Sequence, residues 1–494
     1  MASGGDLFLG LDVGTQSTKA LVYDPETGDV VERSQVPYDL IQGLPSGHAE
    51  QQPEMWLEAV VEAVRALERR GEIRGIGVSG QQHGAVLLGE QYEVVRAAKL
   101  WCDTSTSEEA AALSAELGRS VPAGFTAPKL RYVAEREPDV WARTRHVVLP
   151  HDFINACLCH ELFTEAGDAS GTGYLDPRTG RYDEDAVART APGLAEKLPP
   201  IVATGAVAGR LVESTAQRLG LTASIPVSAG GGDNMMSAVG AGATGPGVVV
   251  CSLGTSATVF AFTGAPLLDP EGLIADFRAS SVVPGTAEPG HLPLLCVMNC
   301  TEPLEAIREL TGRGHDELTA LARAVPPGAD GVTFVPFLVG ERVPNLPNAR
   351  GTLTGLGANG LDAGVLYRAA LEGVAMNLAS GLDRMRGLGL DVAEVRLVGG
   401  AARNELWAEI LAACFGAAVR PMAETETAAL GAAIQAAAAA RGVEPGALPR
   451  SGGESEVVMA PPALAEAYAS LKPCFAAEVE ATSRRGVNER APLA

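Results

Sequence analysis

The chain contains one short pattern twice: an apolar strand, a turn with Gly-Thr and Ser, and a second apolar strand. The first copy runs from Leu9 to Asp24 and the second from Val250 to Ala261. A tight turn of this kind points several backbone N–H groups and hydroxyls inward, which creates an anion-binding concavity suited to phosphate. Two such turns, far apart in the sequence, predict two related domains that hold one polyphosphate between them.

Length and composition exclude several classes of protein. The 494 residues are too many for one ordinary core, and 46% hydrophobic with 20% charged residues is typical of globular domains. The formal net charge of -22 argues against a nucleic-acid partner, because a duplex binder needs a basic surface. No apolar run reaches the ~20 residues of a membrane helix, and we expect no secretory signal. The eight cysteines are scattered in apolar segments, so we expect free thiols and a cytoplasmic protein.

Strand-like and helix-like segments alternate in both halves, which predicts an α/β architecture. In the first half we expect a helix over 54–70, buried strands over 73–79 and 225–229, and a strand passing into a helix over 147–160. In the second half we expect strands over 332–336 and 392–398 and helices over 364–384, 404–415, 427–441 and 463–472. A Gly-rich segment from Gly240 to Gly247 predicts a boundary, with one domain over 1–243 and another over 244–494.

Both turns carry candidate phosphate ligands. They are Gly14, Thr15, Gln16 and Ser17 in the first turn and Gly254, Thr255 and Ser256 in the second. Asp12 directly precedes the first turn, and a carboxylate at a strand end can hold a hydrated Mg²⁺ against phosphate oxygens. The chain has no G-x-x-x-x-G-K-[ST] sequence, which excludes a P-loop as the phosphate site.

A second glycine-rich turn carries a carboxylate. Gly230-Gly231-Gly232 lies between a predicted strand and a predicted helix, and Asp233 and Asn234 follow at the helix start. Glycines there let the backbone approach a ligand closely. Asp233 alone is equally well explained as a helix N-cap. Beside two phosphate turns, we interpret it as a general base that faces the transferred phosphoryl group.

Two polar clusters are suited to sugar hydroxyls, which need both hydrogen-bond donors and acceptors. Gln82 and His83 lie between glycines after a buried strand, and Trp101 lies two residues before Asp103. His83 could instead be a structural histidine and Trp101 an ordinary core residue. A third turn, with Gly399 and Gly400 before Asn404, has room for a planar base, although such strand-to-helix turns are common.

Together these motifs resemble the FGGY family of carbohydrate kinases over nearly the whole chain. The resemblance rests on D-V-G-T-Q-S-T-K at 12–19, G-Q-Q-H-G at 80–84, W-C-D at 101–103, D-A-S-G-T at 168–172, G-G-G-D-N at 230–234 and S-L-G-T-S at 252–256. It continues with P-F-L-V-G-E-R-V-P at 336–344, N-A-R-G at 348–351, R-A-A-L-E-G at 368–373 and V-G-G-A-A-R-N at 398–404.

The resemblance implies two ribonuclease-H-like, actin-like ATPase domains with an interdomain cleft. The first domain would bind the sugar and the second the nucleotide, with ATP and Mg²⁺ as cofactors and a homodimer left open. Adenine would lie near Gly399, Gly400 and Asn404. Asp233 would be the base on the sugar hydroxyl, and His83, Asp103 and Asn234 would contact the sugar. An Asp with the ordinary pKa of ~3.9 would orient the hydroxyl and accept its proton late.

Within the family the motifs are most similar to the xylulokinase branch. That branch often has Met where this chain has Gln82, so D-ribulose and L-ribulose stay open as alternatives to D-xylulose. The Arg-Glu pattern of glycerol kinases is absent. Two other classes share the paired hairpins: an actin-like ATPase without a sugar substrate, and a catalytically silent sugar sensor. The pair of carboxylates, Asp12 and Asp233, favours a sugar kinase over both.

Overall fold

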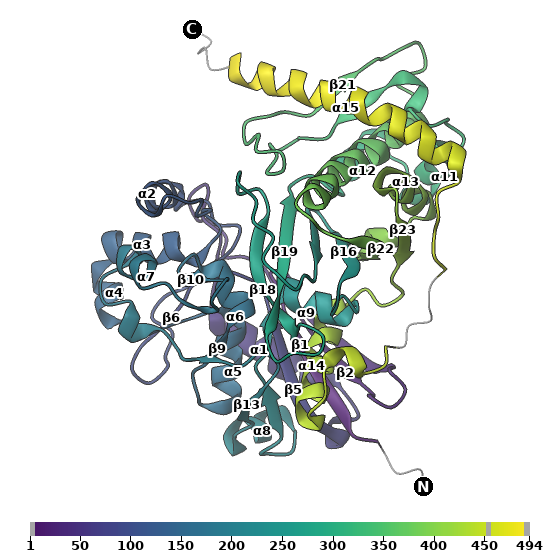
Figure 1. Cartoon of the computed structure of the whole chain (residues 1–494). Helices are drawn as coiled ribbons and strands as arrows, with labels where there is room; N and C mark the ends of the chain where they lie inside the picture. Colours follow the sequence, from purple (N-terminus) through teal and green to yellow (C-terminus); the bar gives the residue numbers. More distant parts are fainter. Residues whose placement is uncertain (1–4, 451–455, 489–494) are drawn as a thin grey trace.

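The structure is a computed structural model that describes residues 5–450 and 456–488. The ends of the two predicted domains, at residues 1 and 494, therefore lie outside the described residues. Two large β-sheets form the centre of the molecule, with helices packed on and between them (Figure 1). No described helix is long and apolar enough to cross a membrane.

The first sheet is built from the first half of the chain. Its order is β13-β14-β5-β1-β2-β3, with β15 paired to β5. The strands are β1 (Leu7–Val13), β2 (Ser17–Tyr23), β3 (Val30–Pro37), β5 (Ile73–Gly80), β13 (Val207–Arg210), β14 (Pro226–Ser228) and β15 (Gly231–Gly232). Every residue of β1 is buried, as expected for a central strand covered on both faces.

The second sheet is built from the second half, with the order β18-β19-β17-β16-β22-β23. Its strands are β16 (Gly247–Leu253), β17 (Ala257–Ala261), β18 (Ala275–Val282), β19 (Pro289–Val297), β22 (Val392–Val398) and β23 (Ala418–Pro421). Five small two-stranded pairs complete the strands: β4 (Glu50–Gln51) with β7 (Ala98–Lys99), β6 (Val86–Leu88) with β8 (His146–Val148), β9 (Thr164–Glu165) with β12 (Ile201–Val202), β10 (Leu175–Asp176) with β11 (Arg181–Tyr182) and β20 (Thr333–Val335) with β21 (Thr352–Thr354).

The two sheets repeat one topology. In the first, an antiparallel hairpin of β1 and β2 continues into β3, and β5 and β14 are added parallel beside β1. In the second, β16 and β17 continue into β19, and β22 and β23 are added parallel beside β16. This shared order is the ribonuclease-H-like arrangement, so the predicted α/β fold with two related units is confirmed.

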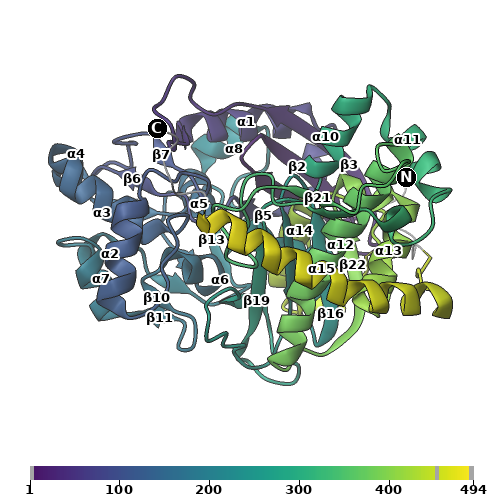
Figure 2. The same ribbon diagram turned by 90° about the horizontal axis from the view of Figure 1, so that it is seen from above.

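The helices follow the predicted pattern closely. They are α1 (Pro53–Ala66), α2 (Ser107–Leu117), α3 (Thr126–Arg136), α4 (Pro138–Arg143), α5 (Pro150–Cys159), α6 (Ala166–Ala169), α7 (Glu184–Thr190), α8 (Glu213–Leu219), α9 (Asp233–Gly240), α10 (Glu302–Thr311), α11 (His315–Arg323), α12 (Ala363–Gly387), α13 (Glu405–Phe415), α14 (Thr427–Arg441) and α15 (Pro462–Asn488). The last is longer than expected and lies across α12 when the molecule is seen from above (Figure 2).

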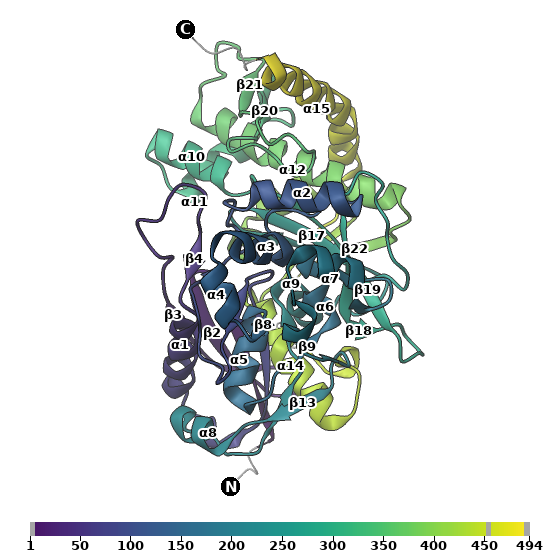
Figure 3. The ribbon, with the colours of Figure 1, turned by 90° about the vertical axis from the view of Figure 1, so that its left-hand side faces the viewer.

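Helix α14 comes from the second half of the chain but packs on the first sheet, against β1, β5 and α9 (Figures 1 and 3). The contact is unusually close because glycines line it. A Cβ on Gly10 of β1 would lie 1.9 Å from the carbonyl oxygen of Ala429, and one on Gly431 would lie 1.8 Å from that of Met236. The second half therefore fixes α9, the helix that begins with Asp233, against the first sheet. The boundary between residues 243 and 244 stays a prediction.

Candidate active site

Strand register brings the candidate acidic residues to one edge of the first sheet. Asp12 lies opposite Ser79 in the parallel pair of β1 and β5, and Gly231 lies opposite Ser79 on the other side of β5. Asp233 follows two residues later, as the first residue of α9. Because parallel strands end at the same edge of a sheet, the ends of β1, β5 and β15 meet there.

Asp233 is a half-buried carboxylate whose two oxygens differ. Oδ1 accepts the backbone N–H of Asn234 at 2.7 Å and its side-chain Nδ2–H at 2.9 Å. Oδ2 has no hydrogen-bond partner in the part of the chain that the structure describes. Burial, together with the negative charges of Asp12 and Asp168, raises the pKa of Asp233 to about 7. This corrects the ordinary pKa assumed from the sequence: Asp233 is a much stronger base than a surface aspartate.

Asp12 is buried and held at the mouth of the first turn. Ser79 Oγ donates to Asp12 Oδ1 at 2.9 Å. Burial raises the pKa of Asp12, while the positive charge of Lys19 and the Ser79 hydrogen bond oppose that rise. Lys19 in turn forms an ion pair with Glu426, just before α14. Asp12 Oδ2 carries no hydrogen bond among the described residues, so this oxygen fits a hydrated Mg²⁺, a cation that prefers oxygen ligands.

Gln82 and Asn234 form one amide network beside Asp233. Asn234 Nδ2 donates to Gln82 Oε1 at 2.8 Å, and Gln82 Nε2 contacts Met235 Sδ at 3.3 Å. Asn234 Oδ1 accepts from Thr258 Oγ1 of β17 at 2.9 Å. Both amides were expected to contact a sugar directly. In this structure their polar atoms are engaged within the protein, and they hold Asp233 in place.

His83 is held in a strained backbone conformation between two aromatic rings. Its φ is 65°, which non-glycine residues rarely adopt, and such strain is common at functional sites. Its ring lies 4.9 Å from that of Phe125 and stacks at 6.0 Å on Phe277 of β18. Burial, with the positive charge of Lys129, lowers the pKa of His83 well below its usual value, so the imidazole is neutral. Nδ1 is buried without a partner among the described residues.

Trp101 ties the first turn to the polar cluster. Its indole Nε1–H donates to Thr15 Oγ1 at 3.0 Å, and the Thr15 hydroxyl donates to Gln81 Oε1 at 3.0 Å. Gln51 Nε2 donates to the carbonyl oxygen of Thr15 at 2.8 Å. Thr15 was expected to bind phosphate, and Trp101 to line the sugar site. The structure shows that each of them holds the other in place, and their contacts with phosphate and sugar stay predictions.

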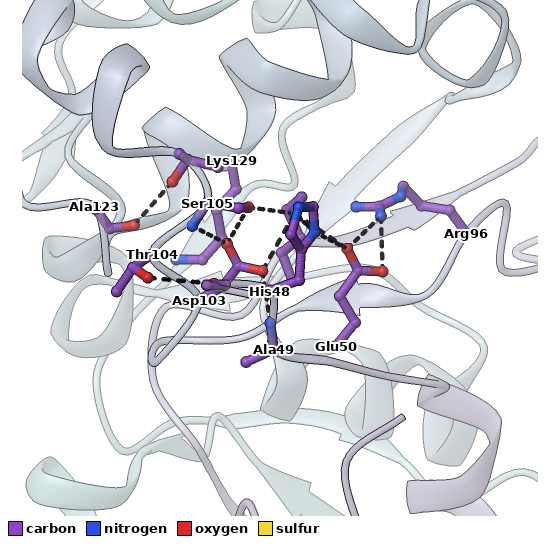
Figure 4. A network of polar contacts seen from close by, with 12 residues as sticks. His48, Ala49, Glu50, Arg96, Asp103, Thr104, Ser105, Ala123 and Lys129 are labelled. Carbon is purple, nitrogen blue, oxygen red and sulfur yellow. Dashed lines mark hydrogen bonds and ion pairs between the residues drawn. The ribbon is translucent and has the colours of Figure 1, made fainter. Parts of the chain in front are cut away.

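Asp103, in the loop that follows β7 and includes Trp101, lies in a buried ion network (Figure 4). Its Oδ2 accepts the Ala49 N–H at 2.9 Å and Lys99 Nζ at 3.2 Å, and its Oδ1 accepts Ser105 Oγ at 2.5 Å. Burial would raise the pKa of Asp103, but these contacts lower it overall. The expected sugar contact of Asp103 thus stays a prediction, while its visible role is to hold the loop.

His48, Glu50 and Asp103 converge closely enough to bind a metal ion. Lys99 already supplies a cation there: its fully buried Nζ lies 3.1 Å from Glu50 Oε1, 3.2 Å from Asp103 Oδ2 and 3.3 Å from His48 Nδ1. An ammonium group with this many acceptors leaves no need for a metal at this position.

The second hairpin is more open than the first. Gly254 and Thr255 at its tip are exposed, and their carbonyl oxygens accept the N–H groups of Thr301 and Cys300 at 3.1 and 3.0 Å. The hydroxyls of Thr255 and Ser256 have no hydrogen-bond partner among the described residues. They are thus available to a phosphate.

The expected base-binding turn follows β22. Gly399 has a φ of 92°, and a Cβ there would lie 2.6 Å from the carbonyl oxygen of Leu253, so glycine is required where this turn meets the end of β16. Gly400 is exposed and has open space at its Cβ position. Asn404 Oδ1 accepts the Trp407 N–H at 3.1 Å, and its Nδ2 donates to Thr319 Oγ1 at 3.0 Å. Asn404 therefore caps α13, and its contact with adenine stays a prediction.

Sequence reasoning gave no role to a buried acidic cluster behind Asp233. Asp168 Oδ2 lies 2.8 Å from His151 Nδ1, and Asp152 Oδ1 lies 3.0 Å from His151 Nε2. Burial alone would lower the pKa of His151, but the two carboxylates raise it well above its usual value. The D-A-S-G-T motif was the available signal for Asp168. Nothing in the local sequence marked His151.

Comparison with known proteins identifies the family. The N-terminal domain model of the FGGY family of carbohydrate kinases matches residues 7–240, and the C-terminal domain model matches residues 249–440. The chain belongs to this family. The predicted family and the two-domain fold are thus confirmed.

Individual relatives match over most of their length. A xylulose kinase from Haemophilus influenzae is 37% identical over 87% of this chain and 90% of its own length. One from Streptomyces rubiginosus is 38% identical over 91% of each chain. The crystal structure of xylulose kinase from Rhodospirillum rubrum superposes with a TM-score of 0.86 at 28% identity, covering 98% of this chain and 100% of that one.

Proposed function

We propose that this FGGY kinase is a xylulokinase, which transfers the γ-phosphoryl group of ATP to O5 of D-xylulose. The observation that carries the proposal is Asp233, an immobilised carboxylate with its pKa raised to about 7, at the sheet edge that also holds Asp12 and the first turn. The similar proteins from Haemophilus influenzae and Streptomyces rubiginosus, both named xylulose kinase, support the choice of ketose.

Asp233 Oδ2 would accept the proton of the sugar O5 hydroxyl. As O5 forms its bond to the γ-phosphorus, the bond from that phosphorus to the bridging oxygen of ADP breaks. The proton passes to Asp233 as the O5–P bond forms. A carboxylate with a pKa near the working pH is well matched to this role, and phosphoryl transfer otherwise depends mainly on positioning and on charge stabilisation.

The remaining residues would position the reactants. The free hydroxyls of Thr255 and Ser256 would hold ATP phosphates, and neutral His83 can donate or accept a hydrogen bond with a sugar hydroxyl. Mg²⁺, when bound, would offset phosphate charge, and Asp12 is the residue that would hold it, through water.

Gln82 stands where related enzymes often have Met, and its contacts within the protein give no reason to replace D-xylulose by another ketose. Its Oε1 accepts from Asn234 and its Nε2 contacts Met235, so both ends of the amide are engaged inside the protein. Gln82 therefore acts here as a packing and orienting residue, and it adds no free polar group to select another ketose. The cytoplasmic location and the homodimer stay predictions.

A coupled ADP-release assay tests the proposal. We expect ADP release to depend on a ketose, with kcat/KM for D-xylulose above those for D-ribulose, L-ribulose and glycerol by roughly tenfold or more, the usual cost of misplaced buried hydrogen bonds. Sugar-independent release would instead indicate an actin-like ATPase, and no release with any sugar would indicate a sensor. A preference for D-ribulose would replace the substrate but keep the reaction.

A further inference from the structure

A side chain from the second half of the chain, which holds the proposed nucleotide turn, contacts Asn234, the residue next to the proposed base. Thr258 lies on β17, three residues after Thr255 of the second turn, and its hydroxyl donates to Asn234 Oδ1 at 2.9 Å. In the sheet, Thr258 pairs with Ser252 of β16 on one side and with Cys296 of β19 on the other. Its backbone is therefore fixed to the same strand pair that carries the open phosphate turn.

Both polar atoms of the Asn234 side chain are hydrogen-bonded, and they link Thr258 to Asp233. Its Oδ1 accepts from Thr258, and its Nδ2 donates to Gln82 Oε1 at 2.8 Å and to Asp233 Oδ1 at 2.9 Å. These partners allow only one orientation of the amide, because a flipped amide would place its oxygen, which cannot donate, against the acceptor oxygens of Gln82 and Asp233. The amide thereby fixes Asp233 Oδ1 and leaves Oδ2 for the acceptor hydroxyl.

We propose that Thr258 is a positioning residue that couples the nucleotide half to the orientation of Asp233. The inference rests on the proposed kinase function. Phosphates held at Thr255 and Ser256 stabilise the β17 end of the hairpin, β17 holds Asn234 through Thr258, and Asn234 holds Asp233. The base is then fully aligned only when the second hairpin is in place. Binding of nucleotide and binding of sugar must strengthen each other by the same factor, because coupling between two sites is reciprocal.

The test replaces Thr258 by Val, which removes the hydroxyl and keeps the shape of the side chain. We expect Thr258→Val to lower kcat by roughly three- to tenfold, the effect of one lost hydrogen bond. We expect the affinity for ATP without sugar to stay the same, because the Thr258 hydroxyl bonds to Asn234 and not to the phosphate turn. At saturating D-xylulose, KM for ATP should rise by the same factor as the lost coupling. Titration calorimetry with D-xylulose, with and without a non-hydrolysable ATP analogue, should show the enhancement of sugar affinity by nucleotide in the parent enzyme and its loss in Thr258→Val.

Three further variants isolate the contact. Thr258→Ser keeps the hydroxyl and should restore both kcat and the coupling. Thr263→Val removes a partly exposed hydroxyl that, among the described residues, bonds only to the Ala265 carbonyl, and it should behave like the parent enzyme. If Thr258 acts through Asn234, adding Thr258→Val to Asn234→Ala should cost little more than Asn234→Ala alone.

The outcomes separate this inference from the proposed function. Parent-like kcat and parent-like coupling in a stably folded Thr258→Val would overturn the inference and leave the kinase assignment intact. A uniform loss of thermal stability, with coupling unchanged and no rescue by Ser, would also overturn it, since Thr258 would then be only structural. If the parent enzyme phosphorylated no ketose at all, the proposed function and the inference would both fail.

Discussion

The two Gly-Thr hairpins have similar backbones but opposite surroundings. In the first, the Thr15 hydroxyl lies between Trp101 and Gln81, and Tyr38 Oη donates to the Gly14 carbonyl at 2.7 Å. In the second, Thr255 is exposed and its hydroxyl has no hydrogen-bond partner in the described part of the chain. One hairpin is locked to its own domain, and the other is open to a ligand.

The same contrast holds for charge. Asp12 precedes the first turn and faces Lys19 across the strand pair, whereas Ser252 occupies the corresponding position before the second turn. Asp12 also contributes to the raised pKa of Asp233. The two copies thus share a backbone. In the proposed function the first would lie beside the base Asp233 and the Mg²⁺ site, and the second would contact the ATP phosphates.

The largest expected effect is loss of the base. Asp233→Asn keeps the size and hydrogen bonds of the side chain but cannot accept a proton. We expect kcat for D-xylulose to fall by roughly 10²–10⁴, the usual contribution of a general base. Steady-state assays at pH 8 measure it, and sugar affinity should change little. Near-normal turnover would show that another group accepts the proton.

The next prediction compares substitutions at the two matching positions that precede the hairpin turns. Asp12→Asn removes the carboxylate before the first turn, and we expect a loss of roughly 10–100-fold in kcat with a higher Mg²⁺ requirement. Ser252→Ala, at the matched position of the second hairpin, should reduce kcat by less than about twofold. Rates measured over a range of Mg²⁺ concentrations give kcat and the Mg²⁺ requirement of both variants. Equal losses in the two variants would contradict the unequal chemistry assigned to the hairpins.

The fold was largely predictable because strands buried on both faces are mostly apolar runs, as in β1, where Asp12 is the one charged residue, and because the repeated hairpin marked both sheets. The position of α14 was not, since its contacts with Gly10 and Gly77 of the first sheet depend on packing between distant segments. Asp12 and Asp233 were recognisable from their turns.

Their partners were not recognisable. Asp168 and Thr258 lie far from Asp233 and Asn234 in sequence, and only the folded chain brings them close. The raised pKa of Asp233 could not be predicted either, because burial and the charges of Asp12 and Asp168 cause it.

A smaller pair of effects tests whether the first hairpin contributes to stability and the second to ATP binding. Thr15→Val leaves Trp101 Nε1–H and Gln81 Oε1 without a partner, so we expect a loss of about 1–3 kcal/mol in the free energy of unfolding. Thr255→Val should leave stability unchanged and raise KM for ATP by roughly three- to tenfold, the value of one hydrogen bond. Urea unfolding measures the free energy of unfolding, and steady-state assays at varied ATP concentration measure KM for ATP. If Thr15→Val changed only KM for ATP, the first hairpin would be a ligand site as open as the second.

The smallest expected effect is a shift in the pH dependence of kcat/KM for the sugar, with no such shift in KM for ATP. With its pKa raised to about 7, Asp233 is protonated as the pH falls below 7 and can no longer accept a proton, so kcat/KM for the sugar should decline on the acid side. Asp168→Asn removes a negative charge that raises this pKa, so the decline should move to lower pH by up to about one unit.

The titration of ATP itself is common to both enzymes, so the difference between their profiles isolates Asp233. The second hairpin has no carboxylate in its turn, and KM for ATP should therefore change with pH in the same way in both enzymes. Asp168→Asn must first be shown to unfold at a temperature close to that of the parent, since Asp168 is buried against His151. A shift of the sugar profile to higher pH would show that Asp168 does not raise the pKa of Asp233. An equal shift in the ATP profile would show that Asp168 affects both hairpins and not Asp233 alone.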